Sequence, residues 1–225
     1  MIKVENVEVW GFSHAIRGMR NPLESWSKSD SYSGEAHIFE NYRECTLGEF
    51  FVGKNDLNLM QRLYKAGTEH RKYLRQIFVS LDITAPLYWW KEFDTYKIGT
   101  VANSCSTMHK IHAKEFTLDD FSHEKMSDGA REALKTVIER LNIARKYYNR
   151  KVDNDMGMHW QTYWWDMIQL LPASYNQKRT ITMNYENVMN IINQRSNHKL
   201  NEWINFVGEL EKLPYVKEIR GEVNE

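Results

Sequence analysis

Four side chains near the end of the sequence have the types and spacing of a binding site. Asn190 follows Asn184 by six residues, Arg195 follows five residues later, and His198 comes three residues after that. Asparagine amides and a neutral imidazole form directional hydrogen bonds, whereas a guanidinium binds anions through several N–H groups. Together these side chains suit a polar ligand that carries negative charge.

Arg195 is unusual because helical periodicity places it on an apolar face. It lies seven residues after Val188 and four after Ile191, and Ile192 continues the same stripe. An unpaired guanidinium on a buried face is strongly unfavourable, so it must meet a carboxylate, a subunit boundary or an anionic ligand. Periodicity alone leaves two interpretations open: a salt bridge, for example to Glu202 or to another chain, and a contact with a ligand.

Other chemistry-bearing residues give weaker signals. His109 and His112 have a spacing that could hold a metal, with Asp119, Asp120 or His123 as further ligands. Two histidines three residues apart are common by chance, so we expect a structural or surface role and no metal site.

Cys105 stands between two serines, and the sequence offers no particular base to activate its thiol. We therefore expect a small buried side chain rather than a nucleophile. Glycine-rich phosphate loops, the Gly-x-Ser-x-Gly elbow and spaced cysteine pairs are absent from the sequence. No common catalytic signature therefore assigns a reaction.

The composition restricts the kinds of partner. The 225 residues are 42% hydrophobic and carry a formal net charge of zero, with acids and bases interspersed. This balance argues against a nucleic-acid polymer or a membrane surface as partner, so an anionic ligand must be bound locally. Cys45 and Cys105 are the two cysteines, and neither an apolar signal segment nor a membrane-spanning run is visible. We expect a cytoplasmic protein.

Apolar periodicity predicts a chain with more helix than strand. Strands are predicted over 3–10 and 76–84, and a short strand or extended segment over 178–184. The second should bury Ile77, Val79, Leu81 and Ile83 on one face. Loops are predicted over 24–35 and 96–112. Helices are predicted over 12–22, 55–66, 87–93, 127–150, 159–172 and 199–213, and in the stretch that begins at Asn184.

For two of these helices the sequence predicts further details. Asn55 is predicted to cap the helix over 55–66, which should end near Gly67. The apolar stripe of the closing helix is predicted to comprise Leu200, Trp203, Ile204, Val207 and Leu210. No repeat, low-complexity tract or linker is visible, so we predict one mixed α+β domain over residues 1–225.

The C-terminal stretch "LLPASYNQKRTITMNYENVMNIINQRSNHKLNEW" resembles the flavin-dependent thymidylate synthases. That family has a Leu-Pro, an Asn, a second Asn six residues on, an Arg five further, and a His with an acid four residues later. The matching residues here are Leu171, Pro172, Asn184, Asn190, Arg195, His198 and Glu202. The His lies one residue closer to the Arg than is usual in the family.

The upstream signature of that family, Arg-His-Arg-x-x-Ser-x-Asn-x-x-Ser-x-Arg, is largely replaced. Asn103 and Ser106 are kept. Other residues stand at the remaining positions: Tyr96, Lys97 and Ile98 in place of Arg-His-Arg, Val101 in place of the first Ser, and Met108 in place of the last Arg. Candidates for replacement positive charge are Lys97, His109 and Lys110.

The resemblance implies a mostly helical domain with a small, mainly antiparallel sheet, assembled as a homotetramer with FAD between subunits. It implies reduction by NADPH and methylation of the uracil ring of dUMP with carbon from methylenetetrahydrofolate, without an enzyme cysteine as nucleophile. Arg195 would lie against the pyrimidine and act in catalysis. Flavin contacts would come from His70, Asn184, Asn190 and His198, and substrate contacts from Lys97, Asn103, Ser106 and Arg195.

Three functions therefore stay open. The first is methylation of dUMP, and the second is a variant enzyme that modifies another pyrimidine nucleotide. The third is a protein without catalysis, either a nucleotide- or flavin-binding protein or a structural oligomer with Arg195 in an interface ion pair.

Overall fold

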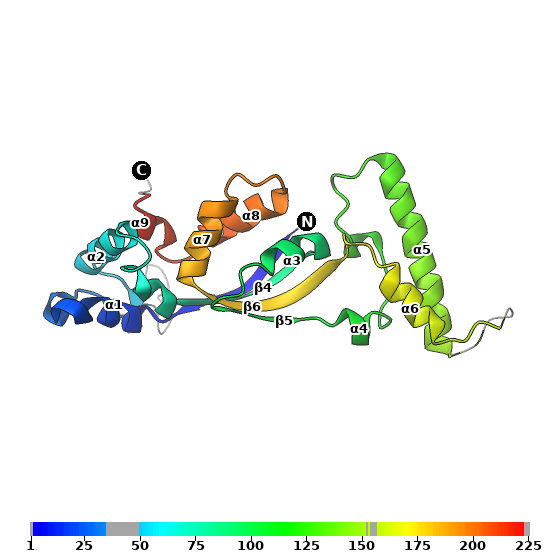
Figure 1. The fold of residues 1–225 in the computed structure, drawn as a ribbon, viewed down its shortest axis with the longest axis horizontal. Coiled ribbons are helices and arrows are strands. Elements are labelled where there is room, and N and C mark those ends of the chain that lie inside the picture. Colours follow the sequence, from blue (N-terminus) through cyan, green and yellow to red (C-terminus); the bar gives the residue numbers. More distant parts are fainter. Residues whose placement is uncertain (1, 35–49, 152, 154–156, 223–225) are drawn as a thin grey trace, which may run out of the picture. The chain divides into compact units, whose positions relative to one another are not determined.

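The computed structural model describes residues 2–34, 50–151, 153 and 157–222; Cys45 and the last residue of the predicted loop 24–35 lie outside them. The elements in chain order are β1 (Lys3–Trp10), α1 (Phe12–Arg20), β2 (Tyr32–Ser33), β3 (Phe50–Phe51), α2 (Lys54–Lys65), β4 (Phe78–Pro86), α3 (Leu87–Phe93), β5 (Thr100–Ser104), α4 (Thr107–Lys110), α5 (Asp128–Arg150), α6 (Thr162–Gln169), β6 (Asn176–Asn184), α7 (Tyr185–Arg195), α8 (Asn201–Leu210) and α9 (Val216–Arg220). Short 3-10 helices cover Asn21–Leu23, Trp26–Lys28, Lys72–Gln76 and Leu118–Asp120. The predicted α+β class, with more helix than strand, is confirmed (Figure 1).

The chain divides into two compact units. The first comprises Met1–Glu5, Asp82–Lys97 and Ala102–Ile181, and the second comprises Asn6–Leu81, Ile98–Val101 and Thr182–Glu225. Strands β1, β4, β5 and β6 each contribute residues to both units. The extent of a single domain over residues 1–225 stays a prediction.

These four strands form one sheet in the order β1-β4-β6-β5, and β2 pairs antiparallel with β3. The Thr180 hydroxyl donates to Asp82 at 2.6 Å, and the Thr182 hydroxyl donates to Ser80 at 3.2 Å. Residue numbers therefore rise along β6 as they fall along β4, which makes this pair antiparallel. The small antiparallel sheet is as predicted.

The alternation predicted for the second strand is confirmed. Val79, Leu81 and Ile83 are almost completely buried, whereas the residues between them are half-buried. The strand starts and ends two residues later than predicted. Its last residue, Pro86, directly precedes the first turn of α3.

The loop predicted over 96–112 is wrong in part, because β5 and α4 lie within it. Most residues of β5 are exposed, and the strand lies at the edge of the sheet. Its order comes from backbone pairing: just beyond it, the Cys105 N–H donates to the Lys178 carbonyl at 2.9 Å. Such pairing leaves little mark on the apolar pattern of a sequence.

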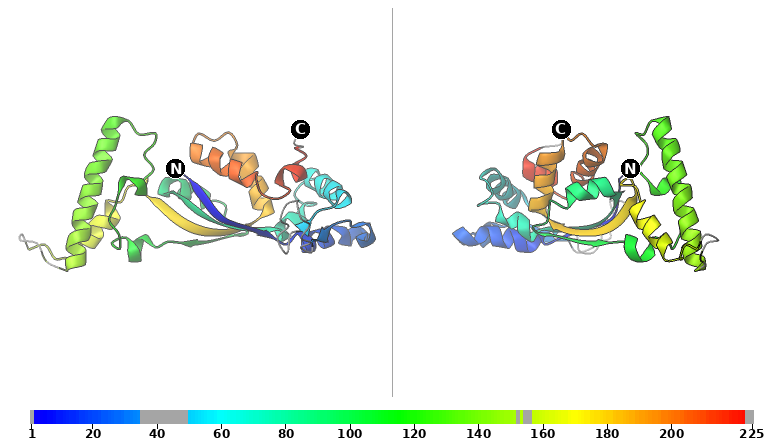
Figure 2. Two further views of the ribbon diagram at one scale, coloured as in Figure 1. Left: turned by 180° about the vertical axis from the view of Figure 1, so that it is seen from behind. Right: turned by 45° about the vertical axis from the view of Figure 1, so that its right-hand side comes forward.

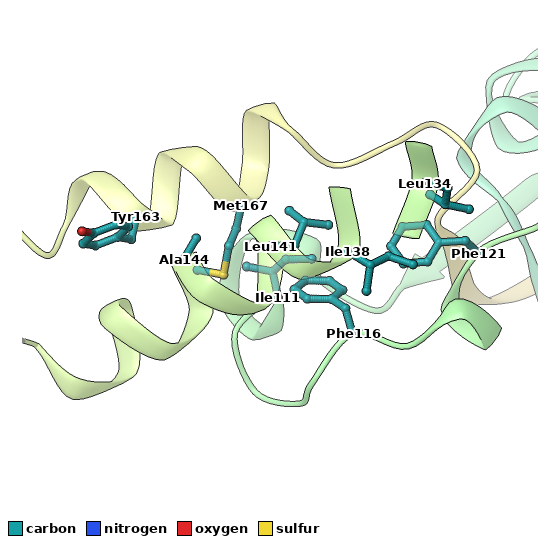
Figure 3. Close-up of a cluster of buried hydrophobic side chains, with 9 residues drawn as sticks. All are labelled: Ile111, Phe116, Phe121, Leu134, Ile138, Leu141, Ala144, Tyr163 and Met167. Atoms are coloured by element: carbon teal, nitrogen blue, oxygen red, sulfur yellow. The ribbon is translucent and has the colours of Figure 1, made fainter. Parts of the chain in front are cut away.

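In the first unit, α5 and α6 lie side by side and enclose a hydrophobic core (Figure 2). The predicted helix over 127–150 is confirmed, and the Ser127 hydroxyl caps its first turn by accepting from the Ala130 N–H. Figure 3 shows the buried side chains of this core: Ile111, Phe116, Phe121, Leu134, Ile138, Leu141, Ala144, Tyr163 and Met167. Helix α6 is shorter than the predicted segment 159–172.

In the second unit, α7 packs against α8, and α2 packs against α9 (Figure 1). Two expectations here are wrong. Ile204 of α8 is 44% exposed, and Phe206 is buried in its place. Asn55 does not cap α2, because the helix begins at Lys54 and the Asp30 carboxylate accepts from the N–H groups of Asn55 and Asp56.

A buried ion pair joins α1 to α2 in this unit. The Arg20 Nε donates to Asp56 at 2.6 Å, and both side chains are almost completely buried. The hydroxyls of Ser29 and Ser31 and the backbone N–H groups of Asp30 and Ser31 also donate to this carboxylate. The carboxylate is thus fully hydrogen-bonded, as a buried charge requires.

None of the helices in the described ranges is long and apolar enough to cross a bilayer.

Candidate functional site

The first turn of α7 is organised by Asn184, which is the N-cap of that helix. Its side-chain oxygen accepts from the Asn187 N–H at 3.0 Å, as in a standard asparagine cap. Asn187 in turn donates through Nδ2 to the Ile98 carbonyl at 2.7 Å and to the Thr100 hydroxyl at 2.9 Å. These bonds hold the segment before β5 against the start of α7.

Gly99 allows this close approach. Its φ is +71°, and a Cβ at this position would lie 2.4 Å from the Asn184 side-chain nitrogen. A larger residue would therefore meet both backbone strain and a steric clash. The start of α7 is a tightly packed polar site rather than a loose surface turn.

Arg195 lies at the other end of α7, where its position explains the apparent conflict with the apolar stripe. Val188 and Ile191 are completely buried, but Arg195 is half-buried, and its guanidinium carbon lies 4.6 Å from the centre of the Trp203 ring. The ring and the negative end of the helix dipole both favour a cation here. The guanidinium thus reaches an amphipathic edge of the core.

His198 lies beside the same tryptophan. Its Nδ1 accepts from the Leu200 N–H at 3.2 Å, and its ring meets Trp203 edge-on at 6.1 Å between centroids. Arg195 and His198 are therefore brought together around Trp203. Asn184 is separated from them by the length of α7, about 16 Å at 1.5 Å per residue.

Glu186, in the first turn of α7, is the centre of a charged cluster that the sequence pattern does not predict. Glu186 is buried and pairs with two arginines: Arg71 Nε lies 3.3 Å from Oε1, and Arg75 Nε contacts Oε2. Arg71 also donates through Nη2 to the Asn190 side-chain oxygen at 3.2 Å. The four-residue spacing of the arginines was visible in the sequence, but their common partner lies more than a hundred residues away.

His70 lines a cavity of the second unit. It is exposed and lines a cavity of about 730 Å³ together with Arg62 and Lys72. Asn184, Asn190, Arg195 and His198 do not line this cavity. His70 nevertheless stands next to Arg71, which contacts Asn190 of α7.

In the first unit, Ser106 and Cys105 line a cavity of about 630 Å³. The Ser106 hydroxyl accepts from the His109 N–H at 3.0 Å and caps α4. Cys105 is exposed, so the expectation of a buried side chain is wrong. The cysteine directly follows β5, which lies at the edge of the sheet and is mostly exposed.

Lysines supply the positive charge of this cavity. Lys3 pairs with Glu5, Lys114 with Asp120, and Lys178 with Asp82. Lys110 also lines the cavity and forms no ion pair within the described ranges. Within the described residues, Lys110 is the lysine of this cavity that remains open to an anionic ligand.

The remaining predicted residues lie elsewhere. Asn103 is exposed on β5, Lys97 is exposed after α3, and His109 is exposed on α4; none of them lines the Ser106 cavity. In the part of the chain that the structure describes, no three His, Cys, Asp or Glu residues are placed to hold a metal ion.

The sequence matches no protein-family model and no curated protein. The fold, however, is that of the flavin-dependent thymidylate synthases. Thymidylate synthase X (ThyX) from Helicobacter pylori, solved with FAD and dUMP, matches with a TM-score of 0.62 at 14% identity, covering 98% of this chain and 97% of that one. A second structure of ThyX from this organism, complexed with FAD and dUMP, has a TM-score of 0.63 at 14% identity and covers 98% and 100%.

Proposed function

We propose that this protein is a flavin- and folate-dependent enzyme that methylates a pyrimidine deoxynucleotide, with conversion of dUMP to dTMP as the parent activity. FAD is the cofactor, NADPH and methylenetetrahydrofolate are co-substrates, and the active form is a homotetramer. One observation carries the proposal: a chain with this fold presents Asn184, Asn190, Arg195 and His198 on and just beyond one helix, at nearly the spacing of the family.

The cations and N–H groups of the second unit suit FAD. A flavin dinucleotide has an anionic pyrophosphate and a ring edge rich in hydrogen-bond acceptors. The cavity that contains His70 also contains Arg62 and Lys72, which suit the pyrophosphate. Asn190 offers N–H donors to the ring. When bound, the flavin supplies hydride transfer.

Binding between subunits reconciles the separation of these residues. Arg195 and His198, at and just beyond the far end of α7, do not line the His70 cavity of their own chain. A cofactor at a subunit boundary contacts one set of residues from each copy. The proposed homotetramer therefore allows His70 of one subunit and His198 of another to contact one FAD.

Arg195 is the proposed catalytic residue. Addition of hydride to the uracil ring generates negative charge on the ring. A guanidinium held against Trp203 stabilises that charge without having to reorganise at the moment of reaction. No thiol nucleophile is required, so the exposed Cys105 has no role in this step.

The phosphate of the nucleotide is assigned to the Ser106 cavity. The family arginine is replaced here by Met108, and Lys110 lies on the next helical turn from Ser106. A lysine binds phosphate as a point charge rather than through a bidentate fork, so it selects less strictly. This difference favours, as a second candidate, a variant enzyme that acts on another pyrimidine nucleotide.

Replacement of Lys110 by alanine is expected to weaken dUMP binding about tenfold, the size of one charge-assisted hydrogen bond. The loss should shrink as the salt concentration rises, because screening reduces the contribution of an exposed cation. Calorimetric titration of the purified protein measures both effects. The matched control is Lys135→Ala, which removes an exposed lysine paired with Glu132 on α5. Equal dUMP affinities for the two variants would remove Lys110 from the site.

Growth of a thymidine auxotroph distinguishes the two candidate enzymes. Rescue by the wild-type gene, lost in the Arg195→Met variant, supports synthesis of dTMP. Failure of the wild type to rescue, with FAD bound to the purified protein, favours the variant substrate. A protein that neither rescues nor binds FAD contradicts both.

A further inference from the structure

We infer that Arg71 is a positioning residue that turns the side-chain NH₂ group of Asn190 toward the flavin. This inference rests on the proposed function and concerns the same site. Arg71 precedes the 3-10 helix Lys72–Gln76, and nothing in the resemblance to flavin-dependent thymidylate synthases singles it out. Its role follows from the contacts of its guanidinium.

The Arg71 side chain is fixed by three contacts on three different residues. Nε lies 3.3 Å from the Glu186 carboxylate, Nη2 lies 3.2 Å from Asn190 Oδ1, and Cζ lies 5.7 Å from the centre of the Tyr64 ring. The side chain is only 16% exposed. An arginine held in this way has little freedom to move when a ligand arrives.

A guanidinium has donors and no acceptor, so it selects one orientation of the Asn190 amide. The oxygen must face Arg71, and the nitrogen must point away from it. Asn190 is half-buried, and its nitrogen has no partner within the ranges that the structure describes. Asn190 therefore presents two N–H groups and no acceptor to whatever binds beside α7.

This orientation defines the ligand atom that Asn190 recognises. The partner must accept a hydrogen bond, as the carbonyl oxygens and imine nitrogens of an oxidised isoalloxazine ring do. An exocyclic amine would bring donor against donor. Arg71 thereby makes this position specific for the acceptor edge of the flavin.

Arg75 offers a matched control for Arg71. Both arginines pair with Glu186, but Arg75 makes no contact with Asn190. Replacement of Arg71 by methionine is expected to weaken FAD binding about tenfold, roughly the contribution of one fixed hydrogen bond. Arg75→Met should leave the affinity within about twofold of the wild type. Quenching of flavin fluorescence measures the dissociation constants, and thermal unfolding of the FAD-free proteins reports their stability.

Asn190 variants separate positioning from a structural role. In an Asn190→Ala background, Arg71→Met should have no further effect on FAD affinity, because the two residues act through one bond. Asn190→Asp should form an ion pair with Arg71 and raise thermal stability, yet it should weaken FAD binding at least tenfold because an oxygen replaces the donor.

The outcomes distinguish this inference from the proposed function. Wild-type protein that binds no FAD overturns both. Wild-type protein that binds FAD, with equal affinities for the Arg71 and Arg75 variants, overturns the role of Arg71 alone. If Arg71→Met does not fold, the Asn190→Asp variant decides: affinity equal to the wild type overturns the inference, and weaker binding by a more stable protein supports it.

Discussion

Replacement of Arg195 by methionine is expected to reduce turnover roughly a hundred- to thousand-fold, the usual loss when one preorganised donor to a developing anion is removed. Methionine keeps an apolar stem against Trp203, so the packing at the end of α7 should survive. The flavin content of the purified variant should equal that of the wild type. Steady-state kinetics with dUMP, NADPH and methylenetetrahydrofolate measure the change.

Lys199→Met is the matched control, since it removes an exposed cation four residues further along the chain. Its turnover should stay close to that of the wild type. The interface interpretation of Arg195 predicts another result: Arg195→Met would dissociate or unfold the oligomer. Gel filtration of both variants distinguishes loss of chemistry from loss of assembly.

Replacement of Asp56 by alanine is expected to lower the free energy of unfolding by about 3–5 kcal/mol. The substitution leaves the buried Arg20 guanidinium without its partner and frees the serine hydroxyls that now donate to the carboxylate. Urea denaturation monitored by tryptophan fluorescence measures the loss. The double variant Arg20→Met/Asp56→Leu should be more stable than Asp56→Ala, because no buried charge remains uncompensated. If Asp56→Ala were as stable as the wild type, that result would contradict this description of the ion pair.

The same carboxylate makes stability depend on pH. Burial acts to raise the pKa of Asp56, but the hydrogen bonds from Ser31, Ser29 and Arg20 outweigh it, so the folded-state pKa is lowered. A lowered folded-state pKa gives a stabilisation that is complete above the ordinary aspartate pKa of about 3.9 and is lost as the pH falls below it. As the pH is lowered from neutral to acid, the urea concentration at the midpoint of unfolding should therefore decrease more steeply for the wild type than for Asp56→Ala.

Much of the secondary structure could be predicted because it leaves a periodic signal. The alternation in β4 and the extent of α5 were visible in the residues themselves. β5 left no such signal, because its residues are mostly exposed and its order comes from hydrogen bonds to β6. The cap of α2 was also hidden, since Asp30 reaches it from a segment 25 residues away.

The candidate site was predictable only where its residues share one element. Asn184 and Arg195 stand on or beside α7, so their spacing was informative. Arg71 was missed because its contacts with Glu186 and Asn190 join segments more than a hundred residues apart. Such pairs of distant residues cannot be identified from the local pattern of one sequence.

The flavin content of the purified protein tests the proposed function most directly. The protein is incubated with FAD, separated from free cofactor by gel filtration, and examined by visible absorption with and without dUMP. We expect a yellow protein with about one FAD per chain and a flavin spectrum that shifts when dUMP is added. A colourless protein that retains no FAD would contradict the proposed function.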